Sequence, residues 1–167
     1  MNKRTMMLGA MSVAMVASVV APVTADAAVT KSKVTVKTVK VIKPESVQVT
    51  YVKNGKTVKK TLKPTTAVQH GSKVVKFKID KKAYTFKLKT AYQYPAYVTY
   101  LKNLDELAIA VEAEDLEGII TAAEKIDKSV SSINEKYLTA AQIKSMEEDA
   151  ATLEAIAQML EEAAAAQ

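Results

Sequence analysis

The chain of 167 residues has no cysteine, no tryptophan, one histidine and four glycines. Without cysteine it cannot form disulfides, iron–sulfur clusters, thiolate-bound zinc or a thiol nucleophile. A single histidine, His70, is a poor basis for a metal site or a catalytic relay, and we interpret it as a loop residue. The composition therefore favours a non-enzymatic binding protein without a metal or another cofactor. Because 49% of the residues are hydrophobic, the chain can still bury a core.

Residues 1–27 have the pattern of a secretory signal peptide. Lys3 and Arg4 precede an apolar run over residues 6–21, and small residues at 23–27 fit a cleavage site. The run is shorter than the roughly 20 residues that cross a bilayer, so we prefer cleavage to the alternative of a membrane anchor. We expect a secreted, cell-wall-associated protein without a membrane span after cleavage.

Charge divides the rest of the chain into two halves of opposite sign. Residues 28–100 carry seventeen lysines and two acidic residues, Glu45 and Asp80, a net charge of +15. Residues 101–167 carry five lysines and fifteen acidic residues, a net charge of −10. Such asymmetry bears on partners and association rather than on fold.

Alternating apolar residues predict a small antiparallel sheet or sandwich of about five strands in a lysine-rich domain, residues 28–94. The Asn54–Gly55 pair predicts a two-residue hairpin turn, which places Tyr51 opposite Val58. A shift in the alternation between residues 36 and 39 indicates a β-bulge.

A second hairpin is expected around a turn at residues 80–83. Apolar residues alternate on both sides of this turn, and their pairing would fix the register. The expected cross-strand pairs are Ile79–Tyr84, Phe77–Phe86 and Val75–Leu88.

Helical spacing in residues 95–167 predicts an acidic, up-down-up three-helix bundle, which makes the whole chain an α+β protein. Asp115 can cap the second helix, and Thr139 with Gln142 forms a capping box for the third. Each helix is expected to bury one apolar stripe. The three stripes are Tyr97, Tyr100, Leu101, Leu104, Leu107, Ala108 and Val111; Ile119, Ala123, Ile126, Val130, Ile133 and Tyr137; and Ile143, Met146, Ala150, Leu153, Ala157 and Leu160.

Residues 104–117 read Leu-Asp-Glu-Leu-Ala-Ile-Ala-Val-Glu-Ala-Glu-Asp-Leu-Glu, and residues 123–126 read Ala-Glu-Lys-Ile. This pattern resembles the helical repeat modules of surface-layer and other cell-wall-associated proteins of Bacillus-type bacteria. The resemblance implies a role at the cell surface, through anionic wall polymers. Because most lysines of this chain precede the helices and the expected bundle is acidic, we expect its polymer site in residues 28–94.

Four lysines are the candidate polyanion site. Alternation places Lys76, Lys78, Lys87 and Lys89 on one face, with Lys76 directly opposite Lys87 in the expected register. Like charges opposite one another destabilise a sheet, so such a face favours an anionic partner. The alternative is a solvated face that guards the sheet against aggregation.

Five tyrosines form a second candidate cluster, and two acidic runs are candidate calcium sites. The tyrosines are interpreted either as packing between the two domains or as a ligand platform. The acidic runs, residues 112–117 and 147–149, lack the loop of a calcium site and are expected to be solvated helix faces. The tyrosines are Tyr84, Tyr92, Tyr94, Tyr97 and Tyr100.

The sequence thus predicts a secreted structural or binding protein of the cell surface. Its basic domain would bind an anionic cell-wall polymer or the acidic face of a neighbouring molecule, and its helices would make protein contacts. Head-to-tail charge pairing would give a homo-oligomer. Specific nucleic-acid binding is not expected of an exported protein. The alternative is a secreted inhibitor, chaperone or signalling protein that acts through the helical bundle.

Overall fold

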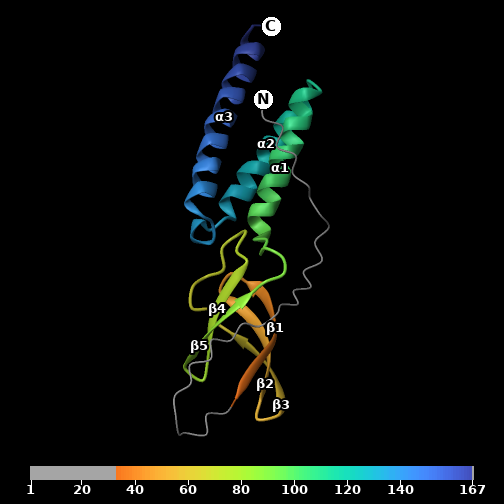
Figure 1. Ribbon diagram of the computed structural model, residues 1–167. Helices are drawn as coiled ribbons and strands as arrows, with labels where there is room; N and C mark the ends of the chain where they lie inside the picture. The colour runs from red at the N-terminus through yellow and green to blue at the C-terminus, as the bar shows by residue number, and fades with distance from the viewer. Residues whose placement is uncertain (1–32, 167) are drawn as a thin grey trace.

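The computed structural model describes residues 33–166, and the predicted signal peptide lies outside them. Five antiparallel strands form one half of the molecule and three helices form the other, so the expected α+β fold is confirmed (Figure 1). The strands are β1 (Val34–Lys43), β2 (Ser46–Lys53), β3 (Lys56–Leu62), β4 (Val74–Ile79) and β5 (Lys82–Lys87). The helices are α1 (Pro95–Glu112), α2 (Leu116–Ser131), a 3₁₀ turn (Glu135–Tyr137) and α3 (Ala140–Ala165).

The strands form two small sheets, β1-β2-β3 and β4-β5, that share one apolar core. Alternate side chains of β2, β4 and β5 enter this core, β1 contributes residues on both sides of its bulge, and β3 only covers its edge. Val39, Val49 and Phe77 have no exposed surface. Full burial of such a side chain stabilises the fold by about 1.5–3 kcal/mol. The core of the β half is therefore apolar, and its lysines lie outside it.

The register of the first hairpin follows the prediction. Asn54 and Gly55 both have positive φ angles, +52° and +74°, which a tight hairpin turn requires. Tyr51 pairs with Val58 across this turn. The register of β1 against β2 shifts between Val36 and Thr38, which confirms the predicted bulge.

The predicted register of the second hairpin is wrong by two residues. The turn consists of Asp80 and Lys81 alone, with φ angles of +50° and +66°, so β5 already starts at Lys82. A shift of two residues leaves every side chain on its expected face but gives it a new partner. The observed apolar pairs are Phe77–Tyr84 and Val75–Phe86.

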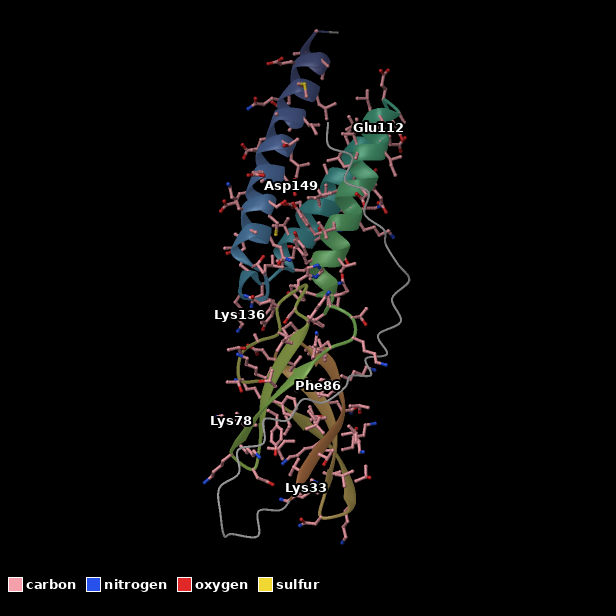
Figure 2. The ribbon with its side chains drawn as sticks, viewed as in Figure 1. Lys33, Lys78, Phe86, Glu112, Lys136 and Asp149 are labelled. Atoms are coloured by element: carbon pink, nitrogen blue, oxygen red, sulfur yellow. The ribbon has the colours of Figure 1, made fainter. Side chains whose placement is uncertain are left out.

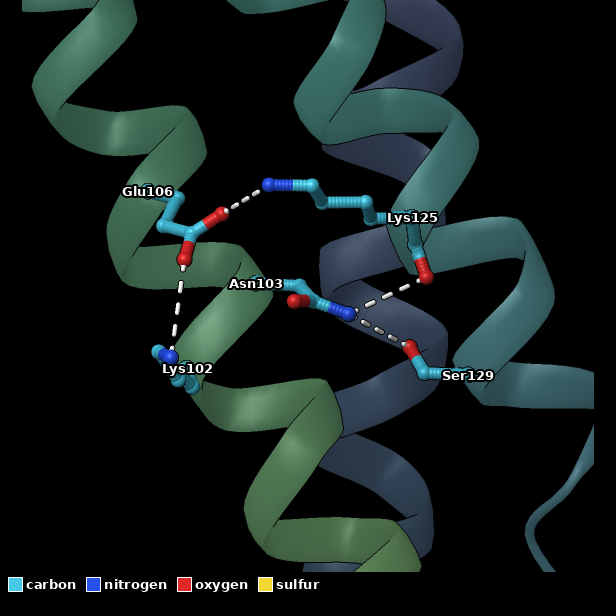
Figure 3. A network of polar contacts seen from close by, with 5 residues as sticks. All are labelled: Lys102, Asn103, Glu106, Lys125 and Ser129. Carbon is cyan, nitrogen blue, oxygen red and sulfur yellow. Dashed lines mark hydrogen bonds and ion pairs between the residues drawn. The ribbon is translucent and has the colours of Figure 1, made fainter.

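A polar network fixes how α1 and α2 pack against each other (Figure 3). The buried Asn103 amide of α1 donates to the Lys125 carbonyl (3.0 Å) and to Ser129 Oγ (3.3 Å) of α2. At the edge of this contact, Lys125 forms an ion pair with Glu106 (2.7 Å). Because an unpaired buried amide would be costly, the network favours one register of the two helices.

The helix caps agree with the prediction, but the apolar stripes agree only in part. Asp115 accepts a hydrogen bond from the Gly118 amide, and Thr139 with Gln142 forms the capping box. However, α2 ends at Ser131, so the last two residues of its expected stripe, Ile133 and Tyr137, lie in the connection to α3.

Helix α3 packs less closely than the other two helices, and none of its residues is buried. Ala150 and Ala157, which the expected stripe included, are exposed. Asp149 and Ile156 take their places on the half-buried side, where Asp149 accepts a hydrogen bond from the Tyr100 hydroxyl (3.0 Å). The uncharged alanines made this face of the helix hard to distinguish by periodicity.

The loop between β3 and β4 joins the two halves of the molecule. The His70 amide donates to the Tyr137 carbonyl (2.9 Å), and the Gln69 side chain donates to the Leu138 carbonyl (3.0 Å). On the outside of this junction, Lys136 forms an ion pair with Glu45 at the β1–β2 turn. The connection between α2 and α3 is thereby attached to the β half.

The imidazole of His70 lies at the centre of this junction. Its Nδ1 accepts a hydrogen bond from the Tyr94 amide (3.1 Å), and its ring meets the Tyr97 ring edge-on, with 4.8 Å between the centroids. Burial lowers the pKa of His70 below its ordinary value of 6.5, because burial disfavours the charged imidazolium. The neutral ring is therefore the form that holds the junction.

Lys81→Gly is expected to stabilise the second hairpin. A non-glycine residue at positive φ costs about 1–2 kcal/mol, and glycine removes this cost while giving the unfolded chain more freedom. We expect the free energy of unfolding in urea to rise by about 0.5–1 kcal/mol. Lys82→Gly, the control, changes the neighbouring strand residue and should lower stability; a gain of equal size in both variants would contradict the turn argument.

Acid should weaken the junction through His70. Because the folded pKa is lowered, its contribution to stability is complete above pH 6.5, the ordinary pKa, and is lost as the pH falls below it. The urea midpoint of the wild type should therefore drop between about pH 7.5 and pH 5.5. His70→Asn keeps an acceptor near Nδ1 but cannot titrate, so its drop should be smaller. Equal drops in the two proteins would refute this role.

Candidate functional site

The outward surface of the β4-β5 sheet, here called the β4–β5 face, carries three of the four predicted lysines. Lys76 and Lys78 alternate with the buried residues of β4, and Lys87 lies at the end of β5. All three are exposed, and Figure 2 shows Lys78 pointing away from the sheet. The fourth, Lys89, is exposed in the bend that follows β5. The predicted lysines are thus neighbours on one side of the molecule.

The pairing of these lysines differs from the prediction. Lys76 lies opposite Thr85 rather than opposite Lys87, because the turn is two residues tighter than expected. Lys78 pairs with Ala83. Lys87 pairs with Val74. Each ammonium group therefore has a neutral neighbour across the strand pair, and the face spreads its charge without a direct like-charge pair.

The sequence analysis missed a second basic surface, on the outward side of the β1-β2-β3 sheet. Directly paired residues share a face in an antiparallel sheet, so the pairs given by the register define this surface. Across the three strands they are Lys40–Gln48–Thr61, Thr38–Thr50–Lys59 and Thr35–Val52–Thr57. We call it the threonine–lysine face. Alternating polar residues within β2 and within β3 indicate one polar side for each strand, but only the pairing of the strands joins them into one surface.

The two acidic residues of the β half already have partners. Asp80 pairs with Lys53 between the tips of the two hairpins, and Glu45 pairs with Lys136 of the helical half. Each pair lowers the pKa of a carboxyl or raises that of an ammonium: Lys136 lowers the pKa of Glu45, and Asp80 raises the pKa of Lys53. Within residues 33–166, no carboxylate pairs with a lysine of either outward face.

The candidate tyrosines are all buried, but they do not form one cluster. Tyr84 stacks on Phe77 inside the sandwich, near the Asp80 turn. The others lie where the halves meet: Tyr97 stacks on Tyr100, and burial raises the pKa of Tyr92 to about 12. The four junction tyrosines are Tyr92, Tyr94, Tyr97 and Tyr100. Their burial favours the packing interpretation over a ligand platform.

The two acidic runs occupy different places. Residues 147–149 lie within α3, as expected, whereas residues 112–117 span the turn between α1 and α2. Within the described part of the chain, no three potential ligand side chains come together as a metal site. None of the helices between residues 33 and 166 has the length and hydropathy needed to span a membrane.

The two outward faces can hold several anionic groups at once. A lysine ammonium attracts phosphate or carboxylate as a point charge on a flexible stem, so such contacts tolerate variation in ligand shape. On the threonine–lysine face, hydroxyl and amide groups can add neutral hydrogen bonds.

Comparison of the chain with protein-family models, curated proteins and solved structures gives no match.

Neutralising the β4–β5 face should not destabilise the protein. Lys76→Gln, Lys78→Gln and Lys87→Gln together remove exposed charges that lie among other uncompensated lysines, so repulsion should fall. We expect the triple variant to be as stable as the wild type in urea, or more stable by a few tenths of a kcal/mol. Added NaCl should stabilise the wild type more than the variant. A clear loss of stability would show that these lysines support the fold itself.

Proposed function

We propose that the protein is an exported, non-enzymatic component of the bacterial cell surface that binds anionic wall polymer through the lysine-bearing faces of its β half. The observation that carries this proposal is the uncompensated charge of the β4–β5 face. Lys76, Lys78 and Lys87 are exposed on one side of the sheet, and the two acidic residues of the β half, Asp80 and Glu45, are paired with other lysines. The expected signal peptide supports export, and the resemblance of residues 104–137 to surface-layer modules supports a wall location.

The alternative, that the lysines only form a solvated face that protects the sheets against aggregation, explains the charge distribution less well. Guard lysines protect sheet edges, where unpaired backbone groups would recruit another strand. The lysines of both faces lie on edge strands, because the β4-β5 sheet has only two strands and Lys40 and Lys59 belong to the outer strands β1 and β3. Lys40 and Lys59, however, share their face with threonine hydroxyls, which a guard does not need. Lysines placed only for solubility would tolerate interspersed carboxylates, which neither face contains.

A binding assay with isolated cell walls tests the proposal. Three exposed ion pairs, each contributing about 0.5 kcal/mol, should give roughly tenfold in affinity. We therefore expect the triple variant Lys76→Gln, Lys78→Gln, Lys87→Gln to bind walls about tenfold more weakly than the wild type in a sedimentation assay. Binding of the wild type should weaken with salt, because exposed charges are screened over about 8 Å at physiological ionic strength.

The matched control removes the same charge from the helical half. Lys102→Gln, Lys128→Gln and Lys144→Gln together should leave wall binding nearly unchanged, although the net charge falls equally. Walls stripped of teichoic acid provide the ligand control and should retain little protein. Equal losses in the two triple variants, or equal binding to stripped walls, would refute the proposal.

A further inference from the structure

The end of the α1-α2 hairpin exposes apolar side chains that nothing in the described part of the chain covers. Ile109 is 67% exposed, Leu116 60% and Ile120 54%. Together with Val111 they make up half of the large apolar side chains that residues 33–166 expose. We call this surface, with its charged surroundings at residues 112–117, the hairpin tip. Leu116 and Ile120 lie one turn apart on the same side of α2, Ile109 lines the groove between the two helices, and Val111 lies on another side of α1. Exposed apolar residues with polar surroundings are typical of protein interaction sites.

The rim of the hairpin tip is acidic. Glu112, Glu114 and Glu117 form no ion pair with any residue between 33 and 166. Figure 2 shows Glu112 at the end of the molecule that lies away from the sheets. A partner that covers the apolar residues must therefore bring positive charge, since buried or crowded carboxylates without cations are costly.

An open groove of about 430 Å³ runs along the α1-α2 contact beside this tip. Ala110, Ala113 and Ala122 give it an apolar lining between two polar ends: Asp115 and Glu117 lie near the turn, and the ion pair of Glu106 with Lys125 lies farther along the helices. Gly118 lies close to the acidic end, where its amide donates to the Asp115 carboxylate (3.0 Å). An apolar lining that ends in carboxylates fits a lysine, whose aliphatic stem packs while its ammonium reaches the acids.

The same chain carries a surface of the opposite kind. On the β4–β5 face, the 43%-exposed Val74 lies directly across from Lys87 and on the same side of the sheet as Lys76 and Lys78. An apolar residue surrounded by cations is thus matched by apolar residues surrounded by carboxylates at the far end of the molecule (Figure 1). Neither surface can pair with itself, because like charges would meet.

We propose that the hairpin tip of one molecule docks on the β4–β5 face of a second copy. This goes beyond the proposed function, because the ligand is the protein itself rather than a wall polymer. In a docked pair, the first molecule keeps a free β4–β5 face and the second keeps a free hairpin tip, so the contact is heterologous and allows open-ended growth. The two surfaces belong to different halves, so a copy cannot satisfy both within itself.

A charge-swap experiment tests the docking. The tip variant carries Glu112→Lys, Glu114→Lys and Glu117→Lys, and the face variant carries Lys76→Glu, Lys78→Glu and Lys87→Glu. By sedimentation velocity at about 100 µM protein and low salt, the wild type should have a weight-average mass at least about twice that of the monomer. Each variant alone should remain monomeric. Their equimolar mixture should associate again, because each reversed surface now faces a complementary one.

The controls separate this contact from general electrostatics and from polymer binding. Glu147→Lys, Glu148→Lys and Glu154→Lys make the same charge change on α3 and should leave association intact. At about 1 M salt, where the Debye length is about 3 Å, the wild type should dissociate. A monomeric wild type, a tip variant that still associates, or a mixture that stays monomeric would overturn the docking. The tip variant should still bind walls, so polymer binding and docking can fail independently.

Discussion

The junction around His70 is the constraint on which the rest of the molecule depends. Each half has only about 70 residues, and domains of this size bury too little surface to be more than marginally stable. The tyrosines of residues 92–100 and the loop that carries His70 complete the packing of both halves at once. The same contacts place the cationic sheets and the anionic helices on opposite sides of the junction. The separation of charge in the sequence thus becomes a separation in space.

That separation explains how so much like charge is tolerated in a small sandwich. The free energy of the β half comes from an apolar core in which Val49 and Phe77 have no exposed surface, while every lysine of the outward faces keeps its ammonium in water. The observed register then gives Lys76 and Lys78 neutral cross-strand neighbours. The repulsion between the lysines is therefore screened by solvent, and it lowers the free energy of unfolding only slightly. The positive charge remains exposed for binding.

Sequence patterns predicted the elements well and the second register poorly, for identifiable reasons. Asn54–Gly55 has residues that accept positive φ, so its two-residue turn is readable, whereas Lys81 adopts the same conformation without any compositional signal. Alternation still placed Lys76, Lys78 and Lys87 on one face, because a slip of two residues conserves sides. Predicting the threonine–lysine face would require the pairing of all three strands β1, β2 and β3, which the local sequence of each strand does not give. The exposure of Ile109 and Leu116 could not be predicted, because apolar residues at helical spacing are expected to be buried, whereas both are exposed near the turn between α1 and α2.

The two proposals place different ligands on the β4–β5 face, and this has a structural consequence. Wall polymer and the hairpin tip of a neighbour would compete for Lys76, Lys78 and Lys87, so either ligand would displace the other there. The threonine–lysine face lies on the other sheet and has no complementary apolar centre, since Val52 on that face is half-buried. It can therefore keep a polymer bound while the β4–β5 face holds a neighbouring molecule. Two basic faces of unequal character would allow one small protein both to attach to the wall and to assemble along it.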